Sequence, residues 1–228
     1  MTTQYPLKIE TFPVGSFQCN CSLIYSTETK EAIAIDPGND AQAFLKVVKA
    51  RQLTLKMMIH THAHFDHIGQ SNFIRKQLGG VPIYLHKEDK TLYEALPEQG
   101  LFFGETLERP DPVDSYIDDD QRFSLAVRKD DIKDKRLLEI LKTIYTPGHT
   151  GGSCSFYMDC LEKPILFSGD TLFHESIGRT DLPGGNYNQI IKSIKQRLLK
   201  LPEETICIPG HGLNTSLFHE KKHNQFLK

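Results

Sequence analysis

The first third of the chain alternates short apolar stretches with turn-forming residues. Three such stretches lie at residues 7–12, 21–26 and 32–36. Each predicts a strand, because the apolar run is short and Pro, Gly or Asp separates it from the next. Over residues 40–52 apolar residues recur at helical spacing behind Asp40, a good amino-terminal cap, and the apolar run Leu55–Ile59 follows. This segment therefore predicts a strand, a helix and a strand.

The pattern repeats with variation in the middle of the chain. We expect a helix near Ile68 to Leu78, ending at Gly79-Gly80, and a buried strand at Pro82–His86. From about Leu92 to Asp120 the chain is rich in Pro, Gly and acidic residues, which predicts a loop. Further strands are expected at residues 123–127, 137–146, 153–158 and 164–170. The charged segment Arg128–Arg136 predicts an extended hairpin tip between the first two of them.

The last third carries the clearest amphipathic helix. Asn186 can cap it, and its apolar stripe consists of Tyr187, Ile190, Ile191, Ile194 and Leu198. The stripe predicts packing in the core, and a strand at residues 205–209 follows. Both halves of the chain, about 1–115 and 116–228, run from strands into helix and strand, and no linker-like segment divides them. We therefore expect one α/β domain over residues 1–228, with two mixed sheets between flanking helices.

Composition and charge narrow the class of partner. The 228 residues are 39% hydrophobic and 25% charged, as in one globular domain. With 27 Lys and Arg against 29 Asp and Glu, the net charge of −2 lacks the basic excess that favours nucleic acid. No apolar run approaches the roughly 18 to 20 residues that span a bilayer. We expect neither nucleic acid nor a membrane as partner.

The amino terminus and the cysteines bear on the compartment. The opening residues, MTTQYPLKIETF, contain no basic region followed by an apolar stretch, so they predict no signal peptide. The five cysteines show no spacing of a disulfide framework, and we expect most of them to be reduced. Both features favour the cytoplasm. Cys19 and Cys21 face one side of an extended segment, which predicts core packing, with binding of a soft metal as the alternative.

Candidate chemistry is concentrated directly after the strand Leu55–Ile59. Four of the ten histidines and one aspartate lie within eight residues: His60, His62, His64, Asp66 and His67. Imidazole and carboxylate groups are ligands for zinc and related divalent ions. Four protonated imidazoles would repel one another, and burying them without partners would be costly. The cluster therefore favours a metal site over a structural role.

Three later segments each place one further donor in a glycine-containing turn at the end of a strand. The donors are His149 in TPGHT, Asp170 in SGDT and His211 in PGHG. Glycine allows positive φ and a sharp bend, so each donor stands at the rim of a sheet. One such turn is weak evidence, but three in order after a histidine-rich loop predict a shared site.

With these motifs the sequence resembles the metallo-β-lactamase superfamily. The signature T-H-x-H-x-D-H is present at residues 61–67, and the likeness covers nearly the whole chain. Within the superfamily it is most similar to short glyoxalase II-type, hydroxyacylglutathione hydrolase-like enzymes. The segments that carry this likeness are NCSLI (20–24), DPG (36–38), PGHT (147–150), SGDTLF (168–173), IGRTDLP (177–183) and IPGHG (208–212). The resemblance implies a four-layer αββα fold.

The resemblance also implies two adjoining metal sites. The implied ligands are His62, His64 and His149 at the first site, Asp66, His67 and His211 at the second, and Asp170 between them. Seven donors are too many for one ion, and two divalent ions leave room for a bridging hydroxide. Zinc is the expected metal, with iron or manganese as alternatives. His60 is expected to support the strand, and His86, His174, His219 and His223 have no implied ligand role, His174 being the first exception to test.

The implied reaction is hydrolysis of a small-molecule thioester, S-D-lactoylglutathione or a related hydroxyacylglutathione. Two ions would lower the pKa of shared water from about 15.7 toward about 7, so that a metal-bridged hydroxide attacks the thioester carbonyl. A thiol with a pKa of about 8.5 leaves as thiolate without a strong general acid. Asp66 is the candidate catalytic residue that holds the proton of the hydroxide.

Two features affect the substrate assignment. Full-length glyoxalase II enzymes add a carboxy-terminal helical segment that helps hold glutathione, whereas this chain stops soon after His211, so we expect glutathione to be held differently or loosely. Arg179 stands where the family commonly has a basic residue that meets a glutathione carboxylate, and a guanidinium suits that contact. A salt bridge with Asp181 is the structural alternative for Arg179.

Other readings of the same motifs stay open. Persulfide dioxygenases are similar in the IGRTD segment and in fold, but they use one iron to oxidise glutathione persulfide; the PGHG segment around His211 favours the hydrolase. A secreted β-lactamase commonly carries a cysteine in its second site, and superfamily nucleases tend to have basic surfaces. A non-catalytic module that binds metal is the remaining class.

Overall fold

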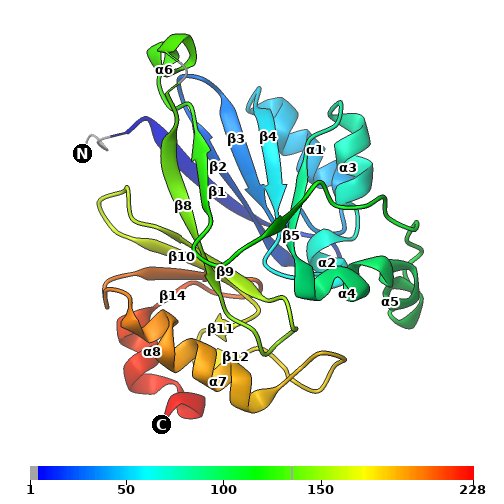
Figure 1. The fold of residues 1–228 in the computed structure, drawn as a ribbon, viewed down its shortest axis with the longest axis vertical. Helices are drawn as coiled ribbons and strands as arrows, with labels where there is room; N and C mark the ends of the chain where they lie inside the picture. Colours follow the sequence, from blue (N-terminus) through cyan, green and yellow to red (C-terminus); the bar gives the residue numbers. More distant parts are fainter. Residues whose placement is uncertain (1–4, 135) are drawn as a thin grey trace.

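Residues 5–134 and 136–228 are described by the computed structural model, in which two six-stranded sheets face each other (Figure 1). The first sheet has the strand order β1-β2-β3-β4-β5-β6. Its strands are β1 (Leu7–Val14), β2 (Cys19–Ser26), β3 (Glu31–Ile35), β4 (Thr54–Ile59), β5 (Ile83–His86) and β6 (Ser115–Ile117). Pairing is antiparallel from β1 to β3 and parallel from β3 to β6, so the sheet is mixed.

The second sheet has the strand order β14-β13-β10-β9-β8-β7. Its strands are β7 (Arg122–Leu125), β8 (Leu138–Tyr145), β9 (Cys154–Met158), β10 (Ile165–Gly169), β13 (Ile206–Pro209) and β14 (Thr215–Ser216). Only β10 and β13 pair in parallel. A small hairpin of β11 (Leu172–Phe173) and β12 (Ser176–Ile177) follows β10.

Helices flank the pair of sheets on both outer sides (Figure 1). The α-helices are α1 (Ala41–Ala50), α2 (Phe65–Ile68), α3 (Ser71–Gln77), α4 (Lys90–Glu94), α5 (Leu96–Phe102), α6 (Lys129–Asp134), α7 (Tyr187–Gln196) and α8 (Leu217–His223). Three short 3₁₀ helices are η1 (Lys87–Asp89), η2 (Leu198–Lys200) and η3 (Gln225–Leu227). None of the helices within the described residues has the length and apolar character needed to cross a membrane.

Three layers of buried apolar side chains hold the four layers together. Neighbouring residues of β2 point to opposite faces of the first sheet, so Leu23 packs toward α1 and α3 while Ile24 packs between the sheets. In β10, Phe167 joins the core between the sheets, and Leu166 packs toward Ile190 of α7. Both faces of each sheet are therefore buried, and the predicted α/β arrangement of two mixed sheets between helices is confirmed.

The helix expected from Ile68 to Leu78 is interrupted. α2 ends at Ile68 and α3 begins at Ser71. The reason is local, because the Gln70 N–H donates to the carbonyl of Gly38 at 3.2 Å instead of continuing the α2 ladder. The Gln70 side-chain oxygen also accepts from the first amide of α1, which ties the start of α1 to this break.

The prediction of a loop from about Leu92 to Asp120 is wrong in part, because this segment contains α5 and β6. Tyr93 and Leu96 are buried against the first sheet, so tertiary packing stabilises a helix in a segment rich in helix-breaking residues. The first sheet also extends through β6, slightly beyond the expected boundary between the halves.

Two further expectations need correction. Tyr187, assigned to the apolar stripe of α7, is 51% exposed, whereas Ile190, Ile194 and Leu198 are buried as expected. The charged segment Arg128–Arg136 does connect two antiparallel strands, but it carries the short helix α6 instead of an extended tip. Residue 135 of that segment lies outside the described residues.

Candidate metal centre

The loop after β4 carries four of the seven predicted ligands, and a buried carboxylate fixes its start. Asp36, directly after β3, accepts from the Thr61 backbone N–H at 2.8 Å and from the Thr61 hydroxyl at 2.6 Å. Further along, the Ala63 N–H donates to the carboxylate of Asp89 at 2.9 Å. These contacts hold His62 and the residues after it at the carboxyl end of the parallel strands, where open α/β sheets bind ligands.

The other three predicted ligands follow strands of the second sheet. His149 lies after β8, Asp170 after β10 and His211 after β13. Glycines let these turns approach closely: a Cβ on Gly210 would lie 2.1 Å from Asp170 Oδ1, and Gly148 has φ of +139° with a Cβ position 2.2 Å from a backbone nitrogen of α7. The ends of both sheets thus meet at one point.

The first predicted ligand set is compact. His64 Nδ1 lies 3.0 Å from His62 Nε2 and 2.9 Å from His149 Nε2. Nitrogens that surround one tetrahedral ion at 2.0–2.1 Å lie roughly 3.3 Å apart, so the observed spacing is close to that of a tridentate site. All three side chains are almost fully buried.

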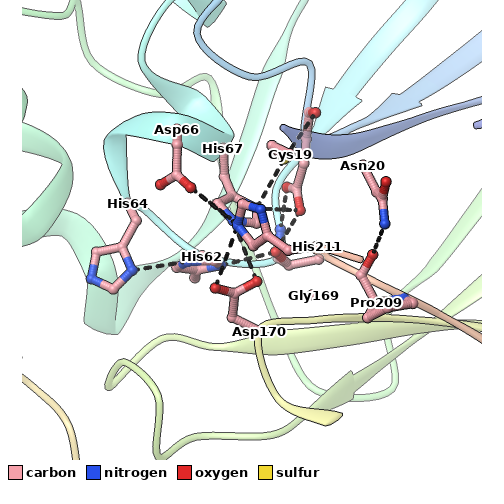
Figure 2. Close-up of polar contacts among 12 residues, drawn as sticks. Cys19, Asn20, His62, His64, Asp66, His67, Gly169, Asp170, Pro209 and His211 are labelled. Atoms are coloured by element: carbon pink, nitrogen blue, oxygen red, sulfur yellow. Dashed lines mark hydrogen bonds and ion pairs between the residues drawn. The ribbon is translucent and has the colours of Figure 1, made fainter. Parts of the chain in front are cut away.

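The second predicted set lies beside the first. His211 Nε2 is 3.1 Å from His67 Nε2 and 3.1 Å from Asp66 Oδ2. The three ligand atoms lie within 4.8 Å of one another. Figure 2 shows His64 on one side of the cluster and the contacts of Asp66, His67 and His211 on the other.

Asp170 contacts both sets, and Figure 2 shows its contacts with the second set. Its Oδ2 is 3.5 Å from His149 Nε2 of the first set, and its Oδ1 is 3.4 Å from His67 Nε2 of the second. Asp170 Oδ1 is buried and has no hydrogen-bond partner among the described residues. A buried carboxylate oxygen without a partner is costly, and a divalent cation would satisfy it. The donor set therefore fits two divalent ions that share this carboxylate.

Outward hydrogen bonds fix the tautomer of the histidines. The Nδ1 atoms of His67, His149 and His211 face Asp36 Oδ2 at 3.0 Å, the Arg179 carbonyl at 2.7 Å and the Phe17 carbonyl at 2.9 Å. Because these oxygens accept, each Nδ1 carries a proton, and each Nε2 faces the cluster as the atom that can bind a cation.

The electrostatics differ between the two ligand sets. In the first set the imidazoles of His62 and His64 are neutral. Burial, together with His67 and His149, holds the pKa of His62 well below its usual range, and burial beside His149 lowers the pKa of His64 to about 3. Burial alone would raise the pKa of Asp170, but the surrounding histidines hold that pKa below the ordinary value. Neutral imidazoles beside an ionised carboxylate are the forms that bind metal.

In the second set burial tends to lower the pKa values of His67 and His211, but the neighbouring carboxylates of Asp66 and Asp170 raise both above the ordinary value. A cation would therefore take the place of protons there.

Sequence reasoning gave no role to three residues that position the ligands. Asp36 orients His67 and anchors Thr61, and the buried Asp89 joins the ligand loop to the His149 turn through Thr150 Oγ1 at 2.8 Å and the Gly152 N–H at 2.6 Å. Asn20 of the first sheet donates through Nδ2 to the carbonyls of Pro209 and Gly212 at 3.0 Å, on either side of His211, and Figure 2 shows the contact with Pro209. Asn20 and Asp36 belong to the NCSLI and DPG motifs, from which a role at the site could have been predicted. Asp89 belongs to none of the recognised motifs.

Arg179 forms the salt bridge that sequence reasoning gave as the structural alternative. Its Nε and Nη2 atoms donate to the two carboxylate oxygens of Asp181 at 2.8 and 2.7 Å. Both side chains are exposed, and the Arg179 carbonyl accepts from His149. The guanidinium is therefore at the surface, while the backbone of Arg179 contacts the first ligand set.

The remaining histidines lie outside the cluster. His60 is buried and contacts the Tyr84 carbonyl at 3.1 Å and the Ser71 hydroxyl at 2.8 Å, in agreement with a supporting role in the strand. His174 stacks on His219, which stacks on His223 and lies 2.9 Å from a carboxylate oxygen of Glu175. Cys19 and Cys21 are buried in the core, with Cys19 Sγ 3.5 Å from His67 Nδ1.

Known proteins share this sequence pattern and fold. Residues 14–211 match the Metallo-beta-lactamase superfamily. Hydroxyacylglutathione hydrolase GloC of Haemophilus influenzae is 38% identical over 226 residues, which cover 97% of this chain and 98% of that protein. The structure of BLEG-1 B3 metallo-beta-lactamase is similar with a TM-score of 0.82 and 36% identity, covering 96% of this chain and 99% of that one. The structure of TTHA1623 in a di-iron-bound form has a TM-score of 0.80 and 31% identity, covering 96% of this chain and all of that one (100%).

Proposed function

The chain belongs to the metallo-beta-lactamase superfamily, and on that premise we propose that it hydrolyses glutathione-type thioesters with two divalent ions. One observation carries the proposal: a complete second ligand set, Asp66, His67 and His211, joined to the first through Asp170. The 38% identity to a hydroxyacylglutathione hydrolase supports the thioester as substrate.

Seven side chains would bind the ions, and one of them, Asp66, would also transfer a proton. His62, His64 and His149 would hold one ion, Asp66, His67 and His211 the other, and Asp170 both. When bound, the ions supply Lewis-acid polarisation of a carbonyl and acidify water. Burial tends to raise the pKa of Asp66, but His67 and His211 keep that pKa below the ordinary value, so the carboxylate is ionised. Asp66 can therefore accept the proton of the attacking water at a carboxylate oxygen. The thiol leaves as thiolate, so no strong acid is required.

The test combines metal analysis with assays on S-D-lactoylglutathione and on glutathione persulfide, using protein loaded with Zn, Mn or Fe. We expect about two ions per chain and release of free thiol from S-D-lactoylglutathione. Active protein with one ion that consumes oxygen with glutathione persulfide would contradict the proposal and indicate the mononuclear-iron dioxygenase.

A second candidate is β-lactam hydrolysis, which the 36% identity to BLEG-1 favours. A β-lactam is also an acyl compound that water can open at such a centre. Hydrolysis of a chromogenic cephalosporin faster than of any thioester would support this candidate and contradict thioester hydrolysis as the main activity.

A further inference from the structure

A pocket opens beside the first ligand set. It has a volume of about 540 Å³, which lies within the usual range for small-molecule sites. His64 and Thr150 line it, and Thr150 directly follows His149. Whatever enters this pocket therefore reaches the candidate metal centre.

The walls of the pocket are mainly apolar. They come from α4, α5 and the segment before α7, through Leu92, Ala95, Phe102, Phe103, Leu182 and Pro183. Phe102 is 79% exposed and lies beside the exposed Leu101 and Phe103, so the end of α5 presents a group of apolar side chains rather than a single one. Phe102 packs edge-on against Phe103, and Phe103 stacks on Phe65 with ring centroids 5.0 Å apart. Because Phe65 lies between His64 and Asp66, this aromatic wall is attached to the ligand loop.

The charges of the pocket have one sign. Glu88 and Glu98 line it and are exposed, and no Lys or Arg is among the described residues that line it. Asp89 also lines it, but its carboxylate accepts hydrogen bonds from Ala63, Thr150 and Gly152. An anionic group placed beside Glu88 and Glu98 would be repelled, and no described lining residue could form an ion pair with it there. Positive charge would come only from the ions that His64 would help to hold, where the thioester carbonyl reacts. The two carboxylates of glutathione therefore do not suit this pocket.

We propose that the pocket holds the acyl group of the thioester and selects acyl groups that are apolar and uncharged, such as medium-chain or aryl groups. The inference rests on the proposed thioester hydrolysis and specifies its substrate class. A short hydroxyacyl group such as lactoyl would leave the aromatic wall uncovered, and a dicarboxylic acyl group would meet Glu88 and Glu98. The thiol portion then remains on the solvent side, where Arg179 is exposed.

The test uses glutathione thioesters that differ only in the acyl group: lactoyl, hexanoyl, phenylacetyl and succinyl. With the metal-loaded chain, kcat/KM for hexanoyl and phenylacetyl should exceed that for lactoyl by about tenfold to a hundredfold, because several methylene or ring carbons leave water. The succinyl thioester should be the poorest substrate.

Variants of the pocket separate its two features. Phe102→Ser should lower the hexanoyl-to-lactoyl ratio by about tenfold, and its exposed position makes loss of folding a minor concern. Glu98→Lys should raise succinyl turnover relative to hexanoyl. Phe226→Ser is the matched control, because Phe226 is 43% exposed and lies in η3, outside the pocket lining. Its ratios should equal those of the unchanged chain.

The outcomes distinguish this inference from the proposed function. If lactoyl is hydrolysed as well as hexanoyl, or if Phe102→Ser leaves the ratio unchanged, the acyl-pocket inference is overturned while thioester hydrolysis stands. If no thioester is hydrolysed, the proposed function fails, and calorimetric titration with hexanamide and lactamide decides the pocket. Equal or weaker binding of hexanamide would then overturn the inference too, and tighter binding that Phe102→Ser abolishes would support it.

Discussion

Asp66 is the residue on which metal binding and proton transfer would converge. Its Oδ2 lies 3.1 Å from His211 Nε2, and the side chain is mostly buried. We predict that Asp66→Asn lowers turnover by about a hundredfold or more, because the amide keeps the shape but cannot accept the proton of water. Steady-state kinetics with metal analysis would measure this. The variant should keep its fold and at least one ion, and a near-normal rate with full metal content would refute the role of Asp66.

Arg179 offers a second comparison at the scale of single residues. We predict that it meets a substrate carboxylate, so Arg179→Met should lower kcat/KM for glutathione thioesters by roughly tenfold to over a hundredfold, the loss of a charge-assisted contact of about 1.5 to 3 kcal/mol. A small uncharged thioester should be little affected.

Asp181→Asn is the control for this comparison. It removes the salt bridge but leaves the guanidinium, and the exposed pair contributes little to stability. Activity on glutathione thioesters should therefore persist in Asp181→Asn. Equal losses in both variants and on both substrates, with a lower Tm, would show that the pair is structural.

The seven predicted donors could be chosen from sequence because each follows a strand and belongs to a motif. The structure brings all seven into one cluster, with the closest ligand atoms about 3 Å apart. Asp89 could not be found this way, because it acts through tertiary hydrogen bonds to residues far along the chain. Side-chain pairing between distant segments leaves no local pattern in a sequence.

The same distinction explains which elements were predicted. Ten of the twelve strands of the two sheets were recognisable because each is short and apolar, and both faces of each sheet are buried. The edge strands β6 and β14, of three and two residues, are too short to give such a pattern. The segment from Leu92 to Asp120 was misjudged because α5 is stabilised by burial of Leu96, not by intrinsic helix preference. Tyr187 was misjudged because its helical spacing fits the stripe of α7, but at the first residue of the helix it lies beyond the core.

His86, at the junction between β5 and η1, should lower the stability of the folded chain in acid. His86 stacks on Tyr145, its Nδ1 accepts from the Glu88 N–H, and burial holds its pKa below the ordinary value. As the pH falls, His86 of the unfolded chain binds a proton near pH 6.5, whereas His86 of the folded chain binds one only at lower pH. The contribution of His86 to the stability of the folded chain is therefore present above pH 6.5 and is lost as the pH falls.

Thermal melts test this at two pH values, about 7.5 and about 5.5, in metal-loaded protein. The fall in Tm between them should be smaller in His86→Gln than in the unchanged chain, since Gln can accept the Glu88 hydrogen bond without titrating. An identical fall in Tm in both proteins would mean that His86 contributes nothing to the loss of stability in acid.

At the scale of the whole molecule, the candidate metal centre lies where the two sheets meet. Four predicted ligands come from the loop after β4 of the first sheet, and three come from turns of the second. Hydrogen bonds already join the sheets there: Cys154 N–H donates to the Thr61 carbonyl at 2.7 Å, and Asn20 N–H to the Gly210 carbonyl at 2.7 Å. The core between the sheets is also continuous. Folding of the pair of sheets therefore does not depend on metal alone, but bound metal should stabilise the contact between the two sheets.

We predict that removal of metal lowers Tm while leaving a cooperative transition. An ion that binds only the folded chain stabilises it by about 2.7 kcal/mol at a concentration of 100 Kd, which in a protein of this size is roughly 5 to 10 °C per site. Calorimetry with excess zinc and with a chelator would measure the shift. Asp170→Ala should greatly reduce it, because Asp170 lies between the two ligand sets, whereas His86→Gln should keep it. Hydrogen exchange should lose protection at the turns of His149 and His211 on metal removal and keep it in α1. Equal Tm values with zinc and with chelator would show that the cluster does not link the sheets through metal.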